Sequence, residues 1–172
     1  MSKRNACLGT HQGFTLIELL VVIAISAILV IIATPAFITY LQTNRLTGAS
    51  QNLYDALQYA RSAAIKTNTN VYVYFKTGSS WCYGINASSA CNCNTASSCS
   101  LGSTSANTSS SLSLSATGLS ANTIKFEPKQ GAAGQASTIT LTNAQGNAIS
   151  VEVGISGDLL LCSTTLSGYA AC

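Results

Sequence analysis

The sequence predicts an α+β protein in which one long N-terminal helix packs against an antiparallel β-sheet domain. Apolar residues recur at helical spacing from about Phe14 to Thr67, whereas apolar and polar residues alternate as in strands from Asn70 onward. A helix and a sheet each have one apolar face to bury, so packing them together is the simplest solution. Six cysteines lie in the strand-rich part and predict disulfide bonds there.

The composition argues against several functional classes. Of the 172 residues, 47% are hydrophobic and 8% charged, with a net charge of +3. These values exclude a charge-driven disordered chain and a strongly basic nucleic-acid scaffold. The one histidine, His11, lies in the N-terminal tail, which argues against histidine catalysis and most zinc sites. We therefore expect a non-enzymatic protein without a cofactor or metal.

Leu16–Ile38 is a run of apolar residues with four interruptions, long enough to cross a bilayer as a helix. Lys3 and Arg4 precede it, and positive charge tends to stay in the cytoplasm. The sequence therefore predicts a single-pass protein whose N-terminus is cytoplasmic and whose remainder lies outside. The alternative, a cleaved secretory signal, has a shorter apolar core that ends at a small-residue cleavage site.

Gly13-Phe14-Thr15-Leu16-Ile17-Glu18 resembles the prepilin motif of type IV pilins and type II secretion pseudopilins. The resemblance implies cleavage of the 1–13 leader after Gly13 by prepilin peptidase and N-methylation of Phe14. It further implies that the 14–38 helix is retained as the membrane and assembly helix. The protein would wait in the inner membrane, with its C-terminal domain in the periplasm, until an assembly platform adds it to a filament of similar subunits.

Glu18 is a carboxylate inside the apolar run, which costs free energy in a bilayer. It could simply reach the headgroups at the membrane surface. The prepilin resemblance implies another role, in which Glu18 pairs with the terminal amine of Phe14 on a neighbouring subunit and selects the assembled register. An unpaired charge in a bundle of helices would be strongly disfavoured.

The helix is expected to continue beyond the membrane over residues 39–67. Pro35 removes a backbone donor, which predicts a kink or local unwinding near Ile31–Pro35. Residues 52–66 carry leucine, alanine-arginine-serine and alanine-isoleucine-lysine groups. This pattern resembles the FimT/FimU/GspH group of minor pilins and pseudopilins, and it implies their pilin-like fold. Taken alone, the stretch could also be a generic amphipathic helix.

Residues 68–172 form the predicted β-rich domain. Strands are expected at 71–76, 81–85, 123–127, 138–142, 149–153 and 159–162, with a hairpin-like turn at 143–147. Between Thr95 and Thr123, 16 of 29 residues are Ser or Thr and none is charged. This stretch offers little to a core and is predicted to be an exposed loop.

Removal of the leader would take Cys7 and leave six cysteines in an oxidising compartment, so three disulfides are expected. We expect Cys162 to pair with Cys172. Cys82, Cys91, Cys93 and Cys99 would form two further bridges whose partners the sequence leaves open. A metal site at Cys91 and Cys93 is disfavoured because their spacing is not that of a zinc motif, and a redox dithiol because no CxxC motif occurs.

Some FimT-like minor pilins take part in DNA uptake through arginines in a C-terminal stretch before a cysteine. Here Asp158 and Leu160 occupy the corresponding place, and an aspartate repels phosphate. The cations of the domain, Lys76, Lys125 and Lys129, are too few to define a basic patch.

The resemblance therefore predicts a minor pilin or pseudopilin with a priming or tip role in a type IV pilus or a type II secretion pseudopilus. Two alternatives remain open at this stage. One is a pilus-tip DNA-binding subunit for natural transformation, and the other is the major pilin of the filament body.

Overall fold

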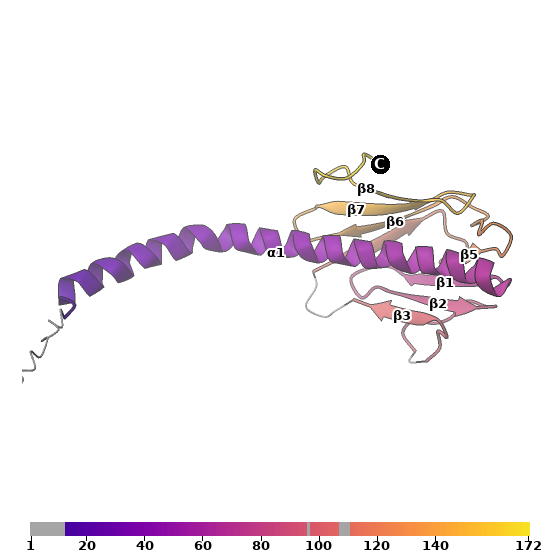
Figure 1. Ribbon diagram of the computed structural model, residues 1–172, viewed down its shortest axis with the longest axis horizontal. Helices are drawn as coiled ribbons and strands as arrows, with labels where there is room; N and C mark the ends of the chain where they lie inside the picture. Colours follow the sequence, from indigo (N-terminus) through magenta and orange to yellow (C-terminus); the bar gives the residue numbers. More distant parts are fainter. Residues whose placement is uncertain (1–12, 96, 107–110) are drawn as a thin grey trace, which may run out of the picture. The chain divides into compact units, whose positions relative to one another are not determined.

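The computed structural model describes residues 13–95, 97–106 and 111–172. The chain divides into two compact units, the first ending at Ile38 and the second comprising Thr39–Cys172. Helix α1 (Leu16–Thr67) contributes to both units, and the strands of the described chain all belong to the second. Figure 1 shows the second half of α1 running alongside these strands.

Both ends of α1 are set by local signals. The Thr15 hydroxyl accepts a hydrogen bond from the backbone N–H of Glu18 at 3.3 Å, as expected of an N-cap residue. The helix ends at Thr67, and Asn68 follows it with a φ of 52°, the left-handed conformation that commonly stops a helix. The expected end of the helix is confirmed, and its start lies two residues later than expected.

Of the kink or local unwinding predicted near Ile31–Pro35, the unwinding is wrong, because α1 remains helical through this stretch. A proline deprives the helix of one hydrogen bond, and the bonds on either side can maintain it. Just before the proline, the Thr34 hydroxyl donates to the carbonyl of Val30 at 2.6 Å. The helix assignment therefore continues across a residue that often interrupts one.

The strands of the described β domain are β1 (Val71–Lys76), β2 (Cys82–Ala87), β3 (Gly102–Ser105), β4 (Ser113–Thr117), β5 (Thr123–Phe126), β6 (Ser137–Thr142), β7 (Ala148–Val153) and β8 (Leu159–Cys162). They pair antiparallel in two four-stranded sheets. Sheet A has the order β3-β2-β1-β5, and sheet B has the order β4-β6-β7-β8. Six of these strands correspond to those predicted from the sequence.

One hydrophobic core joins the second half of α1 to both sheets. Leu53 and Leu57 of the helix are at most 1% exposed, and Phe75 of sheet A and Ile139 of sheet B are fully buried. The Tyr83 hydroxyl of β2 also donates to the Asn52 carbonyl of α1 at 3.4 Å. The predicted packing of a helix on an antiparallel β domain is therefore confirmed.

The prediction of an exposed loop over residues 95–123 is wrong in part, because β3 and β4 lie within it. Leu112 and Leu114 are buried, while Ser113 and Ser115 between and beside them are exposed. Alternation of this kind is what a half-buried strand requires, and two leucines are enough to attach β4 to the core. Abundant serine and threonine therefore did not prevent strand formation.

The turn predicted between β6 and β7 is confirmed. The Asn143 side-chain oxygen accepts hydrogen bonds from the backbone N–H groups of Gln145 at 3.0 Å and Asn147 at 2.9 Å. Gly146 has a φ of 82°, which a residue with a side chain adopts only rarely. An asparagine and a glycine thus close this hairpin.

Candidate functional site

The residues of the prepilin-like motif lie at the exposed start of α1. A Cβ atom on Gly13 would meet nothing within 4 Å, and Phe14 is 82% exposed. Glu18 occupies the first turn, where the positive end of the helix dipole stabilises a carboxylate. The Thr15–Glu18 spacing is that of a capping box, a local sequence signal that marks the start of this helix beside the prepilin-like motif.

The apolar side chains of Leu16–Ile38 are all exposed. Within the described chain, α1 is the one helix that is long and apolar enough to cross a membrane, as judged by its length and composition. Folding of this chain alone therefore leaves these side chains without an apolar environment, which a bilayer or other helices could provide.

Glu18 makes no salt bridge in residues 13–95, 97–106 and 111–172. The nearest cations in the sequence on the C-terminal side begin at Arg45, about 27 residues along, or roughly 40 Å at the rise of an α-helix. The part of α1 that follows Glu18 therefore offers this carboxylate no cation within its neighbouring turns.

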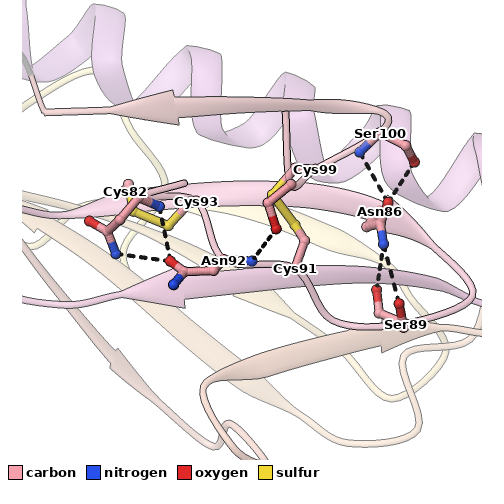
Figure 2. The surroundings of a disulfide bond; sticks show 10 residues. Cys82, Asn86, Ser89, Cys91, Asn92, Cys93, Cys99 and Ser100 are labelled. Carbon is pink, nitrogen blue, oxygen red and sulfur yellow. Dashed lines mark hydrogen bonds between the residues drawn. A yellow bond between two sulfur atoms is a disulfide. The ribbon is translucent and has the colours of Figure 1, made fainter. Parts of the chain in front are cut away.

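Two disulfides cover the outer face of sheet A. Cys82 pairs with Cys93, and Cys91 pairs with Cys99. Figure 2 shows the two bonds close together above β2. A Cβ atom placed on Gly84 would lie 2.3 Å from the Cys99 sulfur, so the loop can sit this close to the strand only because residue 84 is glycine.

Polar contacts attach the rest of the loop between β2 and β3 to sheet A. The Asn86 side-chain oxygen accepts hydrogen bonds from the Ser100 backbone N–H at 3.0 Å and hydroxyl at 2.5 Å, and its amide donates to the Ser89 carbonyl at 3.1 Å (Figure 2). Lys76 donates to the side chain of Asn94 at 3.1 Å. The structure thus supplies the pairing among Cys82, Cys91, Cys93 and Cys99 that the sequence left open.

The third disulfide joins Cys162 to Cys172, as expected from the sequence. Its two sulfurs lie near Glu152, but cysteines bonded to each other cannot act as thiolate ligands. This group therefore does not form a metal site while the disulfide is intact.

Arg61 lies at a junction of α1 with two loops, a role that the sequence analysis did not predict. Its guanidinium donates to the Gln130 carbonyl at 3.5 Å. Cβ atoms on Gly131 and Gly157 would come within 2.7 Å and 3.2 Å of the Arg61 side chain, respectively, and both glycines have positive φ. Positive φ at two glycines that approach an arginine is a tertiary feature, which sequence spacing alone does not reveal.

Asp158 is exposed directly after the turn that Gly157 closes with Gly154. A hydrogen bond from the Ser156 hydroxyl, a bond from its own backbone N–H and the charge of Arg61 hold the pKa of its carboxyl below the ordinary value. The carboxylate thus stays charged at neutral pH at the place where phosphate-binding arginines would be needed.

The three candidate DNA-binding lysines do not form one cluster of free charge. Lys125 pairs with Glu127 at 2.7 Å, and this hydrogen bond raises the pKa of the lysine. Lys76 is the last residue of β1 and donates a hydrogen bond to Asn94. Lys129 is exposed in the loop that follows β5. DNA binding through these residues stays a prediction, and their arrangement gives it no support.

Two protein-family models match the chain. The model described as type II transport protein GspH matches residues 49–158, more than half of the chain. The chain belongs to the GspH family. The model described as prokaryotic N-terminal methylation motif matches residues 9–34, which include the Gly13–Glu18 motif. No curated protein sequence matches the chain.

The fold of this GspH-family chain is similar to that of the type IV minor pilin FimU of Pseudomonas aeruginosa. One crystal form of FimU superimposes with a TM-score of 0.51 at 19% sequence identity, over 71% of this chain and 91% of FimU. A second crystal form gives a TM-score of 0.48 at 20% identity, over 67% of this chain and 91% of FimU. The first match confirms the predicted pilin-like fold.

Membership of this family identifies the chain as a subunit of a pilus or pseudopilus that assembles with other pilin-like subunits. The family is structural and non-enzymatic. The methylation motif and the apolar N-terminal helix fit a pilin anchored in the inner membrane. The GspH match spans the end of α1 from residue 49 and strands β1 to β7, and the methylation match includes the exposed start of α1 as far as residue 34.

Proposed function

We propose that this chain is a minor pilin or pseudopilin that is held in the inner membrane and then incorporated into a filament to prime it or form its tip. Its N-terminus faces the cytoplasm, and Thr39–Cys172 lies in the periplasm. Prepilin peptidase cleaves after Gly13 and Phe14 is N-methylated, after which the inner-membrane assembly platform adds the subunit to a type IV pilus or type II secretion pseudopilus.

The observation that carries this proposal is the exposure of every apolar side chain in Leu16–Ile38. A continuous run of apolar side chains is more stable in an apolar environment than in water, and the bilayer is the first such environment that the chain meets. In a filament, the same surface would be buried against the equivalent helices of other subunits. One surface would thus serve first as the anchor and then as the assembly element.

Glu18 would give the assembled helices their register. Cleavage creates a positively charged amine at Phe14, four residues away in sequence, and no salt bridge within the described chain occupies the carboxylate. A neighbouring subunit displaced along the filament would bring its Phe14 amine to Glu18. A buried charge without a partner is costly, so the pairing would favour one register over its alternatives. Pro35 would lie at the membrane-distal end of this assembly segment.

The mass of the protein extracted from membranes tests the processing step. The expected mass corresponds to loss of residues 1–13 and gain of one methyl group, and the change should disappear in a strain without prepilin peptidase. A protein that retains Met1 in a strain with active peptidase would contradict the proposal. So would a protein that begins beyond Pro35, because it would lack the assembly helix.

A further inference from the structure

The two sheets have four edge strands, and the edges of sheet B are covered by the chain itself. The outer side of β4 exchanges two hydrogen bonds with Gly78. The Gly78 N–H donates to the Leu114 carbonyl at 2.8 Å, and the Leu114 N–H donates to the Gly78 carbonyl at 3.1 Å. Next to β8, the C-terminal segment runs alongside Cys162, and Ser163 N–H donates to the Ala170 carbonyl at 2.9 Å. Both edges are thus occupied for part of their length.

The β5 edge of sheet A is also protected. The backbone N–H groups at its two ends, Thr123 and Glu127, donate to the carbonyls of Ser120 at 3.0 Å and Ala132 at 2.8 Å. Between them, Lys125 forms its ion pair with Glu127. Charged side chains on an edge strand discourage pairing with another strand.

The β3 edge differs from the other three. All four residues of Gly102–Ser105 are exposed, and Figure 1 shows β3 at the border of sheet A. The Ala106 N–H donates to the Trp81 carbonyl at 2.8 Å, which identifies the hydrogen-bonded pairs of the β2–β3 ladder. By alternation, the backbone N–H and C=O groups of Ser103 and Ser105 point away from β2.

Nothing in the composition of β3 blocks this edge. The stretch from Thr95 to Thr123 contains no charged residue and no proline, two of the features that natural edge strands use to prevent pairing. Among the described residues, none donates a backbone hydrogen bond to Ser103 or Ser105 from the open side. This edge can therefore accept a further strand through main-chain hydrogen bonds.

We propose that β3 is the docking edge for an extended strand of a different filament subunit. A second copy of this chain could pair head to tail only through another open edge, and the edges at β4 and β8 are partly occupied while that at β5 carries an ion pair. Two β3 edges could pair only about a two-fold axis. Subunits whose N-terminal helices run parallel in one filament are related by rotation and translation instead, so this pairing does not fit.

This inference rests on the proposed function, because it assumes that the chain enters a filament. The partner strand would be extended and uncharged, since main-chain bonds provide the contact and the small side chains of β3 offer no charge to pair. Its use of a different partner would limit each chain to one place in the filament. That limit would explain why the chain is a minor rather than a major subunit of the filament.

Site-specific photo-crosslinking of the full chain in cells that build the filament tests the proposal. The probe p-benzoylphenylalanine replaces Ser105 on the β3 edge or, as the control, Ser115 of β4, which is also an exposed serine. We expect an adduct between position 105 and a different pilin-like subunit, identified by mass spectrometry, and at least tenfold less of it from position 115. An adduct with a second copy, equal adducts at both positions or no adduct in assembled filaments would overturn the proposal.

Variants at Ser103 separate edge pairing from folding. With the probe at position 105, Ser103→Lys adds an edge charge and should reduce the adduct at least tenfold, whereas Ser103→Ala keeps the N–H and should leave it unchanged. Both variants should retain the three disulfides in the extracted protein. An undiminished adduct in a folded Ser103→Lys variant would contradict strand pairing. If filaments lack the chain altogether, the proposed function fails and this inference with it.

Discussion

The two halves of α1 bury their apolar side chains in different surroundings. In the first half, Ile25 is 54% and Leu29 62% exposed, whereas Leu53 and Leu57 in the second half are 1% and 0% exposed. The second half shows the one-sided pattern of a helix in a globular domain. The first half is apolar on every side, as a helix surrounded by lipid or by other helices must be.

This difference separates two sources of stability within one helix. The second half is stabilised by the two sheets of its own chain, so its contribution should be measurable in the isolated subunit. The first half adds nothing to the core of the second unit, and its apolar surface becomes useful only in a bilayer or a filament. Substitutions in the two halves should therefore affect different measurements.

The largest effect is expected from Glu18→Ala. This variant should insert in the membrane and fold normally but be absent from sheared filaments or pseudopili, because it cannot pair with the Phe14 amine of a neighbour. Quantitative immunoblotting of membrane and filament fractions measures the result. Glu152→Ala, which removes a half-buried carboxylate from sheet B, is the matched control and should be incorporated normally. Normal incorporation of Glu18→Ala would refute the register role.

Leu57→Ala and Leu29→Ala apply the same change to the two halves. Leu57→Ala should lower the free energy of unfolding by about 2–5 kcal/mol, because it leaves a cavity in the core. Leu29→Ala should change it by less than about 0.5 kcal/mol, as for an exposed site. Denaturant titration in mild detergent can follow the fluorescence of Trp81, which is the one tryptophan and is 5% exposed. Equal effects would show that the first half also contributes to the folded domain.

Gly84→Ala tests the close packing of the disulfide loop on β2. The added methyl group would collide with the Cys99 sulfur, and overpacking of this kind costs about 1–3 kcal/mol. Gly48→Ala in α1 is the control, because a Cβ atom there meets nothing within 4 Å. It should stabilise the helix by up to about 1 kcal/mol. Mapping of the disulfides in both variants would reveal whether Gly84→Ala also changes their pairing.

The features predicted well from the sequence are those encoded by local patterns. Helical spacing identified α1, alternation identified six strands, and asparagine and glycine identified the turn at Gly146. The motif at Gly13–Glu18 could be recognised because its residues are adjacent in the chain. Each of these signals is contained within a short segment, so tertiary structure was not needed to interpret it.

The features that the sequence did not predict depend on contacts between distant segments. Leu112 and Leu114 lie in a serine-rich stretch, and only their burial against the core makes it a strand. Gly84 has its role because two disulfides pack on it, and Arg61 because two loops converge there. The unwinding predicted near Pro35 is absent for a local reason, since a single lost hydrogen bond does not outweigh the helical residues on both sides.

The smallest expected effect is the pH dependence introduced by Asp158. Its pKa is lowered in the folded chain, so its charge stabilises the fold above about pH 5 and the stabilisation is lost as the pH falls through the lowered pKa. Asp158→Asn should lower Tm at pH 7 by no more than about 2 °C, because the group is exposed. The difference from wild type should shrink as the pH falls through the lowered pKa and the carboxyl becomes protonated. A difference that stays constant across this acid titration would mean that the substitution disturbs the turn itself rather than removing a favourable charge.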